Sequence, residues 1–347
     1  MTHRIAVIPG DGIGPETVGV AVDVMRAAGV DFDEVRFDIG ADRYSRDGHI
    51  MSDEDVAKLR GCDAILKGPI GPAIGDPKVP SGIVERGIIL RLRTELDLYI
   101  SVRPFVGRGS DFVIVRENSE GAYAGEGGFL RRGTPAEVAT QGSVNTRLGV
   151  ERCIRYAFAT AAARPRRHLA LVHKTNVLTF AGDLWRRTFD QISLDFPDVT
   201  TAYFHVDAAC IYLVEDPTRF DVVVTDNLFG DILTDLAGAV TGGVGFAGTA
   251  NLNPERTAPS MFEPVHGSAH DSVGTDRVNP SSQLLSAVMM LEFLGEDDAA
   301  KAIREALSAV IDAGSPPTRV GHDVVEALRP RCLPAVDTGA GTQEVDP

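Results

Sequence analysis

The stretch Arg4-Ile-Ala-Val-Ile-Pro-Gly-Asp-Gly-Ile-Gly-Pro-Glu16 passes from an apolar run into a glycine-rich turn. The apolar run predicts a buried strand over 4–9, and Pro15 suits the first turn of a helix. Val18, Val22 and Met25 then recur at helical spacing. Strand, turn and helix in this order are typical of an α/β protein. The turn does not match GxGxxG, so the sequence does not support a classical Rossmann site.

The same alternation continues along the chain and predicts an α/β sheet. Apolar runs predict further strands at 32–39, 63–70, 98–104, 111–116, 168–173, 199–206 and 220–225. Helical spacing predicts helices at 83–96, 149–163, 281–294, 297–313 and 321–329. Residues 124–146 are rich in glycine and polar side chains, which indicates a protruding arm.

The composition argues against several classes of protein. The 347 residues are 44% hydrophobic, enough for a large core or for two lobes that share a sheet. The net charge of −15 argues against nonspecific nucleic-acid binding, which needs a basic surface. The apolar runs are too short to span a bilayer, and we expect no signal peptide. The four cysteines form no CxxC pair, so we expect reduced thiols in a cytoplasmic protein.

Arginines gather near predicted strand ends. Arg91 and Arg93 fall in the helix 83–96, Arg103 ends the next predicted strand, and Arg116 ends the strand after it. A guanidinium group binds a carboxylate through two hydrogen bonds, so three converging arginines suit a substrate with two carboxylates. A surface arginine is the alternative for any one of them. Arg103 and Arg116 favour a site, because sites in open α/β sheets lie beyond strand ends.

Two aspartates four residues apart follow the predicted strand 220–225. If a helix starts near Leu228, Asp231 and Asp235 share one of its faces. Like charges at this spacing repel, so the pair predicts a cation between them, and all-oxygen ligands favour Mg²⁺ or Mn²⁺. Asp207, just past another predicted strand, is a candidate third ligand. Aspartates favoured by a helix dipole are the alternative.

Two further side chains are candidates for proton transfer. Lys174 leaves the buried strand 168–173, where burial or a nearby cation can lower a lysine pKa and make it a general base. Tyr123, seven residues after Arg116, is a candidate proton donor. A solvated lysine and a packing tyrosine are the alternatives.

The segment Glu263-Pro-Val-His-Gly-Ser-Ala-His-Asp271 is a candidate dinucleotide-binding turn. Gly267 and Ser268 would let backbone amides approach phosphates. Asp271 would accept hydrogen bonds from a ribose 2′-hydroxyl and repel a 2′-phosphate, which favours NAD over NADP. An ordinary turn is the alternative.

Five motifs, in order over nearly the whole chain, resemble the isocitrate/isopropylmalate dehydrogenases. They are GDGIGPE at 10–16, LDLYISVRP at 96–104, VRENSEG at 115–121, DNLFGD at 226–231 and FEPVHGSA at 262–269. The resemblance implies a two-lobed α/β fold, with a mixed central sheet flanked by helices and no classical Rossmann domain. It implies a cofactor-binding lobe of 1–98 and 242–347, and a substrate, metal and dimerisation lobe of 99–241 with its arm at about 124–146. It also implies a homodimer with shared active sites.

The resemblance further implies an activity and a role for each candidate. The activity is oxidation of a 3-substituted malate at its 2-hydroxyl by NAD, followed by release of carbon dioxide. The three arginines Arg93, Arg103 and Arg116 would bind carboxylates, and Tyr123 would be the acid. The partner subunit's Lys174 would be the base. The metal ligands would be Asp231, Asp235 and the partner subunit's Asp207, holding Mg²⁺ or Mn²⁺. The NAD contacts would be Glu263, His266, Gly267, Ser268, Ala269, Asp271 and Asn279.

Substrate choice would depend on the residues that face the C3 substituent. The resemblance places Ile89 and Leu90 there, with Val177 and Asn176 close by. Isocitrate enzymes carry polar residues at these positions, so the apolar side chains favour 3-isopropylmalate and leucine biosynthesis. Tartrate, D-malate, homoisocitrate and isocitrate remain alternatives within the same reaction class.

Three features depart from the pattern of isopropylmalate enzymes, and two other function classes compete. The segment between Pro104 and Asp111 is shorter than usual, and Arg86 stands where many isopropylmalate enzymes carry a glutamate. The motifs at 96–99 and 116–121 resemble more closely the isocitrate, homoisocitrate and tartrate/malate branches of the family. A non-catalytic regulatory subunit would lack a catalytic group, whereas Tyr123 and Lys174 are both present. A metal-dependent hydrolase would not need the arginines or the loop at 263–271.

Overall fold

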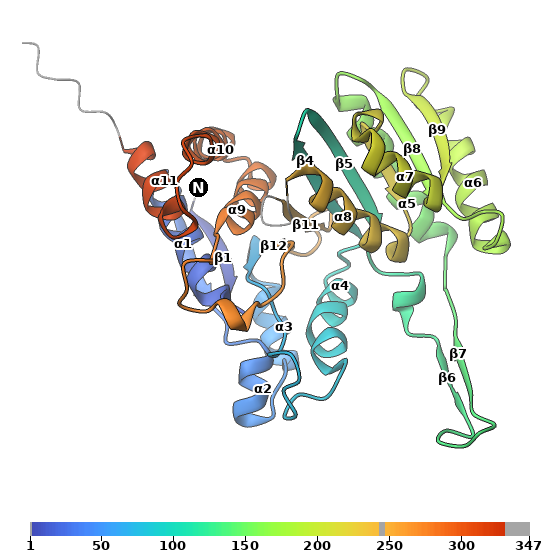
Figure 1. Ribbon diagram of the computed structural model, residues 1–347, viewed down its shortest axis with the longest axis horizontal. Helices are drawn as coiled ribbons and strands as arrows, with labels where there is room; N and C mark the ends of the chain where they lie inside the picture. Colours follow the sequence, from blue (N-terminus) through green and yellow to red (C-terminus); the bar gives the residue numbers. More distant parts are fainter. Residues whose placement is uncertain (1, 243–246, 330–347) are drawn as a thin grey trace, which may run out of the picture.

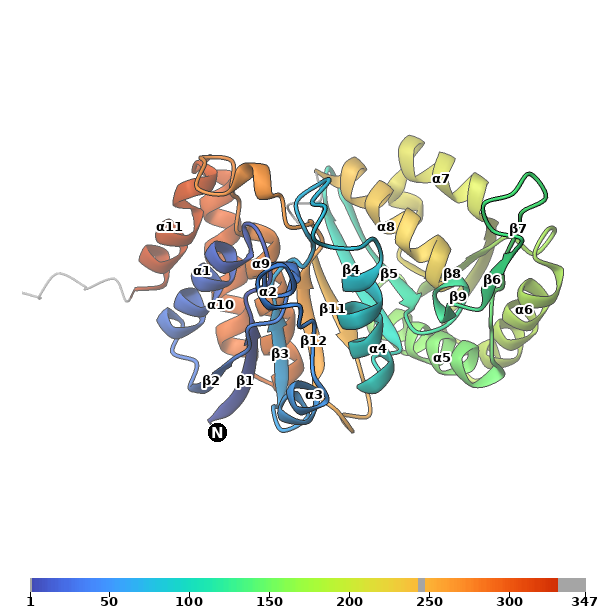
Figure 2. The same cartoon turned by 90° about the horizontal axis from the view of Figure 1, so that it is seen from below.

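One large sheet organises the computed structural model, which describes residues 2–242 and 247–329 (Figure 1). The sheet has ten strands in the order β2-β1-β3-β12-β11-β4-β5-β10-β8-β9. The strands are β1 (His3–Ile8), β2 (Phe32–Arg36), β3 (Ala64–Lys67), β4 (Ile100–Gly107), β5 (Ser110–Glu117), β8 (His168–His173), β9 (Thr200–His205), β10 (Val222–Thr225), β11 (Gly248–Leu252) and β12 (Ser260–Pro264). Helices cover both faces of this mixed sheet (Figure 2), which confirms the predicted fold class.

The helices differ from the predicted set in several places. They are α1 (Gly14–Ala27), α2 (Ala41–Asp47), α3 (Asp53–Leu59), α4 (Arg91–Glu95), α5 (Arg147–Ala163), α6 (Thr179–Ser193), α7 (Val206–Glu215), α8 (Asn227–Thr241), α9 (Ser281–Leu294), α10 (Asp297–Asp312) and α11 (Val320–Leu328). The predicted helix 83–96 is instead a π-helix, η1 (Glu85–Leu90), that continues into α4. Within the described ranges no helix is long and apolar enough to cross a membrane.

The predicted arm is an exposed hairpin. Strands β6 (Gly127–Leu130) and β7 (Val138–Gln141) form a separate two-stranded sheet, and every residue of both strands is exposed. Figure 1 shows the hairpin extending away from the rest of the molecule. The division into lobes at residues 98 and 242 stays a prediction.

Antiparallel pairing is confined to the middle of the sheet. Strand β11 runs antiparallel to both β12 and β4, and β4 runs antiparallel to β5. Strands β4 and β5 are joined by Arg108 and Gly109, both with positive φ (49° and 81°), as tight hairpin turns require. This two-residue turn accounts for the short segment after Pro104. Arg103 therefore lies inside β4, and the prediction that it ends a strand is wrong.

Alternating side chains build a core on each face of the sheet. On β1, Ile5 and Val7 belong to a cluster with α1 and α9, whereas Ala6 and Ile8 belong to a cluster with α3 and α4. On β5, Val113 and Val115 join the first of these clusters, and their neighbours face a third cluster with α7 and α8. This period of two is the ordinary geometry of a strand buried on both sides. One face of the sheet thus carries α4 and α8 (Figure 2).

The turn after β1 is held by a buried carboxylate. Asp11 is fully buried and accepts hydrogen bonds from the amides of Ala41 and Gly71, both at 2.8 Å, and of Asp42 at 2.9 Å. A Cβ at Gly40 would come within 2.3 Å of the Asp11 side chain. Asp11 therefore fixes three separate segments of chain at one end of the sheet.

We predict that Asp11→Ala destabilises the protein by about 2–3 kcal/mol, because buried amides would lose their acceptor. Urea unfolding followed by circular dichroism measures the change. Asp11→Asn keeps one acceptor oxygen and should cost less, and Asp23→Ala, at an exposed position of α1, is the control. Equal midpoints for Asp11→Ala and Asp23→Ala would show that the carboxylate does not hold the turn.

Candidate active site

Arg103 and Arg116 point to the same face of the β4–β5 pair. Arg116 lies opposite Ser101, and Arg103 is two residues further along β4. Diagonal neighbours of this kind share a face. Phe105 and Phe112 lie opposite each other on that face and are buried. The two arginines thus continue this row along the β4–β5 pair, away from the turn that joins the two strands.

Helix α8 lies over these arginines. Asp226 caps its N-terminus through a 2.8 Å hydrogen bond from a backbone amide of the first turn. Gly230 follows, and a Cβ there would come within 2.5 Å of Arg116 Cγ. Glycine at this position lets the helix lie directly on the arginine, which brings Asp231 and Asp235 over the same face.

Arg116 donates three hydrogen bonds within the site, and 1% of its surface is exposed. Its Nε and Nη2 donate to Asn227 Oδ1 at 3.0 and 2.7 Å, and its Nη1 donates to Asp231. The second oxygen of Asp231 accepts a hydrogen bond from the Tyr123 hydroxyl at 2.8 Å. Burial, and then this hydrogen bond, raise the pKa of Tyr123. The phenol therefore stays protonated and can serve as an acid.

Arg93 and Arg103 complete a group of three buried guanidinium groups. Arg103 donates to Thr234 Oγ1 at 2.6 Å and lies 3.7 Å from Asp235 Oδ1. Burial, and then the charge of Arg116, lower the pKa of Arg93 to about 10. The same two causes lower the pKa of Arg103. The three predicted arginines therefore lie close enough to repel one another.

Glu263, whose side chain is 12% exposed, supplies a negative charge beside them. Its oxygens accept from Lys67 Nζ at 2.6 Å and from Asn251 Nδ2 at 2.7 Å. Burial favours the neutral acid, but Lys67 and then Arg93 hold the pKa of Glu263 at about 2. Lys67 is 1% exposed and is not among the residues predicted from the sequence. Its position inside the apolar run 63–70 could have indicated that this lysine is buried and paired.

Two donors of this cluster have no partner. The Nε atoms of Arg93 and Arg103 are buried and make no hydrogen bond to any described residue. Buried donors in folded proteins are nearly always paired. The incomplete pairing of three neighbouring guanidinium groups suits an acidic ligand, because a carboxylate matches guanidinium geometry.

Lys174 and Asp207 pair with each other rather than with Asp231. Lys174 Nζ donates to Asp207 Oδ1 at 2.6 Å, and the Asp207 side chain is 67% exposed. Among the described residues, no three histidine, cysteine or acidic side chains gather closely enough to hold a metal ion. Asp207 thus does not join Asp231 and Asp235 within one chain, and its predicted role depends on a second subunit.

The predicted dinucleotide loop packs on the glycine-rich turn that follows β1. The Ser268 carbonyl accepts a hydrogen bond from the amide of Ile13 at 2.9 Å, and a Cβ at Gly12 would lie 1.9 Å from that carbonyl oxygen.

His266 Nε2 is buried and has no partner among the described residues. Asp271 is exposed and lies 3.5 Å from Arg277. Of the other predicted contacts, Gly267 and Ala269 are exposed, Asn279 is half-buried, and Glu263 lies in the arginine cluster.

The predicted specificity residues lie on two segments. Ile89 and Leu90 are half-buried at the end of the π-helix, immediately before α4. Asn176 and Val177 are exposed in the turn after β8. Arg86 is exposed on the π-helix.

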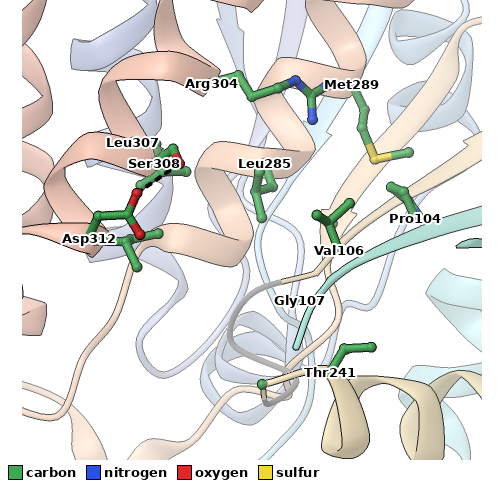
Figure 3. A pocket seen from close by; sticks show the side chains of 13 residues that line it. Pro104, Val106, Gly107, Thr241, Leu285, Met289, Arg304, Leu307, Ser308 and Asp312 are labelled. Carbon is green, nitrogen blue, oxygen red and sulfur yellow. Dashed lines mark hydrogen bonds between the residues drawn. The ribbon is translucent and has the colours of Figure 1, made fainter. Parts of the chain in front are cut away.

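A cavity of about 500 Å³ lies on the other face of β4 (Figure 3). Pro104 and Val106 line it, with Leu285 and Met289 of α9 and Leu307 of α10. Because Pro104 and Val106 alternate with Arg103 along the strand, the cavity opens away from the arginines. Within the described chain its lining contains none of the predicted site residues, so we assign it no part in the reaction.

Comparison with known proteins finds similarity over nearly the whole chain. The family model described as isocitrate/isopropylmalate dehydrogenase matches residues 4–328. A 3-isopropylmalate dehydrogenase of Nocardia farcinica is 52% identical over 90% of this chain and 95% of its own. The corresponding protein of Corynebacterium efficiens is 51% identical over 94% and 99%. An isocitrate dehydrogenase structure from Methylococcus capsulatus superposes with a TM-score of 0.85 at 36% identity, covering 95% of this chain and 100% of that one. The chain belongs to the isocitrate/isopropylmalate dehydrogenase family.

Proposed function

We propose that this protein oxidises 3-isopropylmalate with NAD and decarboxylates the product to 4-methyl-2-oxopentanoate, a step of leucine biosynthesis. The buried arginine group carries this proposal, since the unpaired Nε atoms of Arg93 and Arg103 suit a dicarboxylate. The relatives at about 50% identity that are named for this substrate support it. Cys62, Cys153 and Cys210 are free, which suits the reducing cytoplasm.

The substrate would lie between α4 and α8. Arg93, Arg103 and Arg116 would hold its two carboxylates. Ile89 and Leu90 lead directly into α4, and they would contact the isopropyl group together with Val177 of the partner subunit. An apolar pocket separates substrates that differ by one methylene by only about 1–3 kcal/mol, so related alkyl malates would also react.

Two groups would have to bind for the reaction. Asp231 and Asp235, with Asp207 of the partner subunit, form an all-oxygen donor set that fits Mg²⁺ or Mn²⁺. The unpaired His266 Nε2 and the exposed Gly267 fit a dinucleotide, and Ser268, Ala269, Asp271 and Asn279 would complete its site. The bound cation would lower the pKa of the C2 hydroxyl, and NAD would accept the hydride.

The protein's own side chains would move two protons. The partner subunit's Lys174, held by its 2.6 Å hydrogen bond to Asp207, would accept the proton of the C2 hydroxyl. The C2 ketone lies β to the carboxyl group on C3, so that the bond between C3 and this carboxyl group breaks and carbon dioxide leaves. Tyr123, kept protonated by burial and oriented by Asp231, would donate a proton to C3.

A homodimer would complete the site. Helices α7 and α8 expose a row of large apolar side chains, and large exposed apolar patches mark protein interfaces. The row comprises Ile211 (54% exposed) and Val214 (61%) on α7 with Leu228 (41%) and Ile232 (53%) on α8. Asp207 stands one turn before Ile211 on α7, so association through this row would carry Asp207 and Lys174 to the partner.

A substrate panel tests the activity. With NAD and Mn²⁺, we expect turnover of 3-isopropylmalate to exceed that of isocitrate, homoisocitrate, tartrate and D-malate, read as NADH absorbance. Removal of the cation by EDTA should abolish turnover. Turnover of D-malate or tartrate without turnover of 3-isopropylmalate would refute the proposed substrate.

Complementation tests the shared site. Lys174→Met and Tyr123→Phe homodimers should each be nearly inactive, because each lacks one group at both sites. Coexpression should restore about one quarter of wild-type activity, since half of the dimers are hybrids with one intact site. Absence of any recovery in hybrids purified by two tags would show that Lys174 acts within its own chain.

Cofactor choice tests the loop. Asp271→Lys should reduce the preference for NAD over NADP by roughly tenfold, about 1.4 kcal/mol, because the acid would no longer repel a 2′-phosphate. Asp276→Lys, an exposed acid five residues away, is the charge-matched control. An unchanged preference in Asp271→Lys would place the ribose elsewhere.

A further inference from the structure

A buried histidine stands immediately before Lys174 without a hydrogen bond. His173 is the last residue of β8 and is fully buried. Neither ring nitrogen finds a hydrogen-bond partner among the described residues. Its ring centroid lies 5.8 Å from the ring centroid of Trp185 on α6 and 5.6 Å from that of Phe229 on α8. The His173 and Phe229 rings meet edge to face. Buried polar groups without partners are rare and call for an explanation.

A carboxylate at the N-cap of α8 lies close to the His173 ring. His173 Nε2 lies 3.5 Å from Asp226 Oδ2, just beyond a good hydrogen bond. Asp226 Oδ1 already accepts the Phe229 amide at 2.8 Å, so Oδ2 is the oxygen that faces the ring. Burial raises the pKa of Asp226 to about 6 and lowers the pKa of His173 to about 4. A shift of a few tenths of an ångström would close this contact into a hydrogen bond.

This contact joins two segments that carry chemistry. His173 is covalently next to Lys174, which the proposed function assigns to the partner's site. Asp226 begins the helix that carries Asp231 and Asp235, which the proposed function assigns to the chain's own site. One chain would thus give Lys174 to the partner's active site and α8 to its own active site. The contact between His173 and Asp226 connects these two segments.

We propose that His173 and Asp226 are positioning residues: together they set the end of β8, and with it Lys174, against the N-terminus of α8. In the dimer this buried contact couples the two active sites, because each chain gives Lys174 to one site and α8 to the other. Both the positioning and the coupling rest on the proposed function, because Lys174 must act as the base. Failure of the wild-type substrate panel would refute that function, whereas failure of the mutant cycle below would refute only the contact.

A double-mutant cycle tests the contact in the whole protein. His173→Phe keeps the aromatic packing and removes both nitrogens. Asp226→Ser keeps a capping oxygen and removes Oδ2. Each change should lower kcat roughly 10- to 100-fold with KM for substrate and NAD unchanged, because a small misplacement of the base slows proton transfer without weakening binding. The double mutant should lose no more than either single mutant.

Conservative and matched variants separate positioning from general packing. His173→Gln keeps a polar group and should recover part of the lost kcat. His168→Phe, at the other end of β8, should leave kcat unchanged. Wild-type kcat in both His173→Phe and Asp226→Ser would overturn the proposal, as would additive losses in the double mutant. If His173→Phe does not fold, Asp226→Ser alone still decides, because a wild-type kcat there would refute the contact.

Hybrid dimers test the coupling. In a hybrid of a Lys174→Met chain with a Tyr123→Phe chain, one site remains, with its pocket on the first chain and Lys174 on the second. His173→Phe should lower its kcat whether placed in the first chain or in the second, because the contact orients both α8 and Lys174. A loss from only one chain would overturn the coupling. If the hybrid itself has no activity, the shared site fails, while the double-mutant cycle still tests the contact.

Discussion

Three guanidinium groups buried side by side are the constraint on which the rest of this structure depends. Removing like charges from water is unfavourable unless anions and hydrogen-bond acceptors surround them. Helix α8 supplies such anions and acceptors through Asp231, Asn227 and Thr234, and β12 supplies a further anion, Glu263. The match is incomplete, because two Nε atoms stay unpaired. That deficit distinguishes the cluster from a fully paired ion-pair network, and it is consistent with the carboxylate-binding role that we propose for it.

The position of this cluster follows from the middle of the sheet. Antiparallel pairing of β4 with β5 puts Arg103 and Arg116 diagonally opposite each other on one face. Helix α8 can lie on that face because Gly230 leaves room for the Arg116 side chain. The apolar clusters on either side fix α4 and α8, so Arg93 and Asp231 reach the arginines from helices that are themselves packed. Rigid elements of this kind hold catalytic groups better than loops do.

The sequence predicted most of the strands and the main members of the site, because both depend on local patterns. Periodicity revealed the strands at 4–9 and 168–173, and the four-residue spacing placed Asp231 and Asp235 on one helix face. It did not reveal the π-helix at 85–90, because six residues are too few for apolar spacing to separate a π-helix from an α-helix. Nor did it reveal the Lys67–Glu263 pair, because nearly two hundred residues separate its members and only the order of strands brings them together. Arg103 was misplaced at a strand end because the Arg108–Gly109 turn has no apolar signal of its own.

The order of strands also governs how the chain can assemble during synthesis. The strands β4, β5, β8, β9 and β10 are all present once residue 225 has been made. By contrast, β3 lacks its second neighbour until β12 emerges around residue 260, and β11 must then fit between β12 and β4. One edge of the amino-terminal strands therefore stays unpaired while the middle of the protein folds. Unpaired strand edges can pair with other chains and aggregate. The edge of β3 is therefore open to such aggregation until residue 264 has been made.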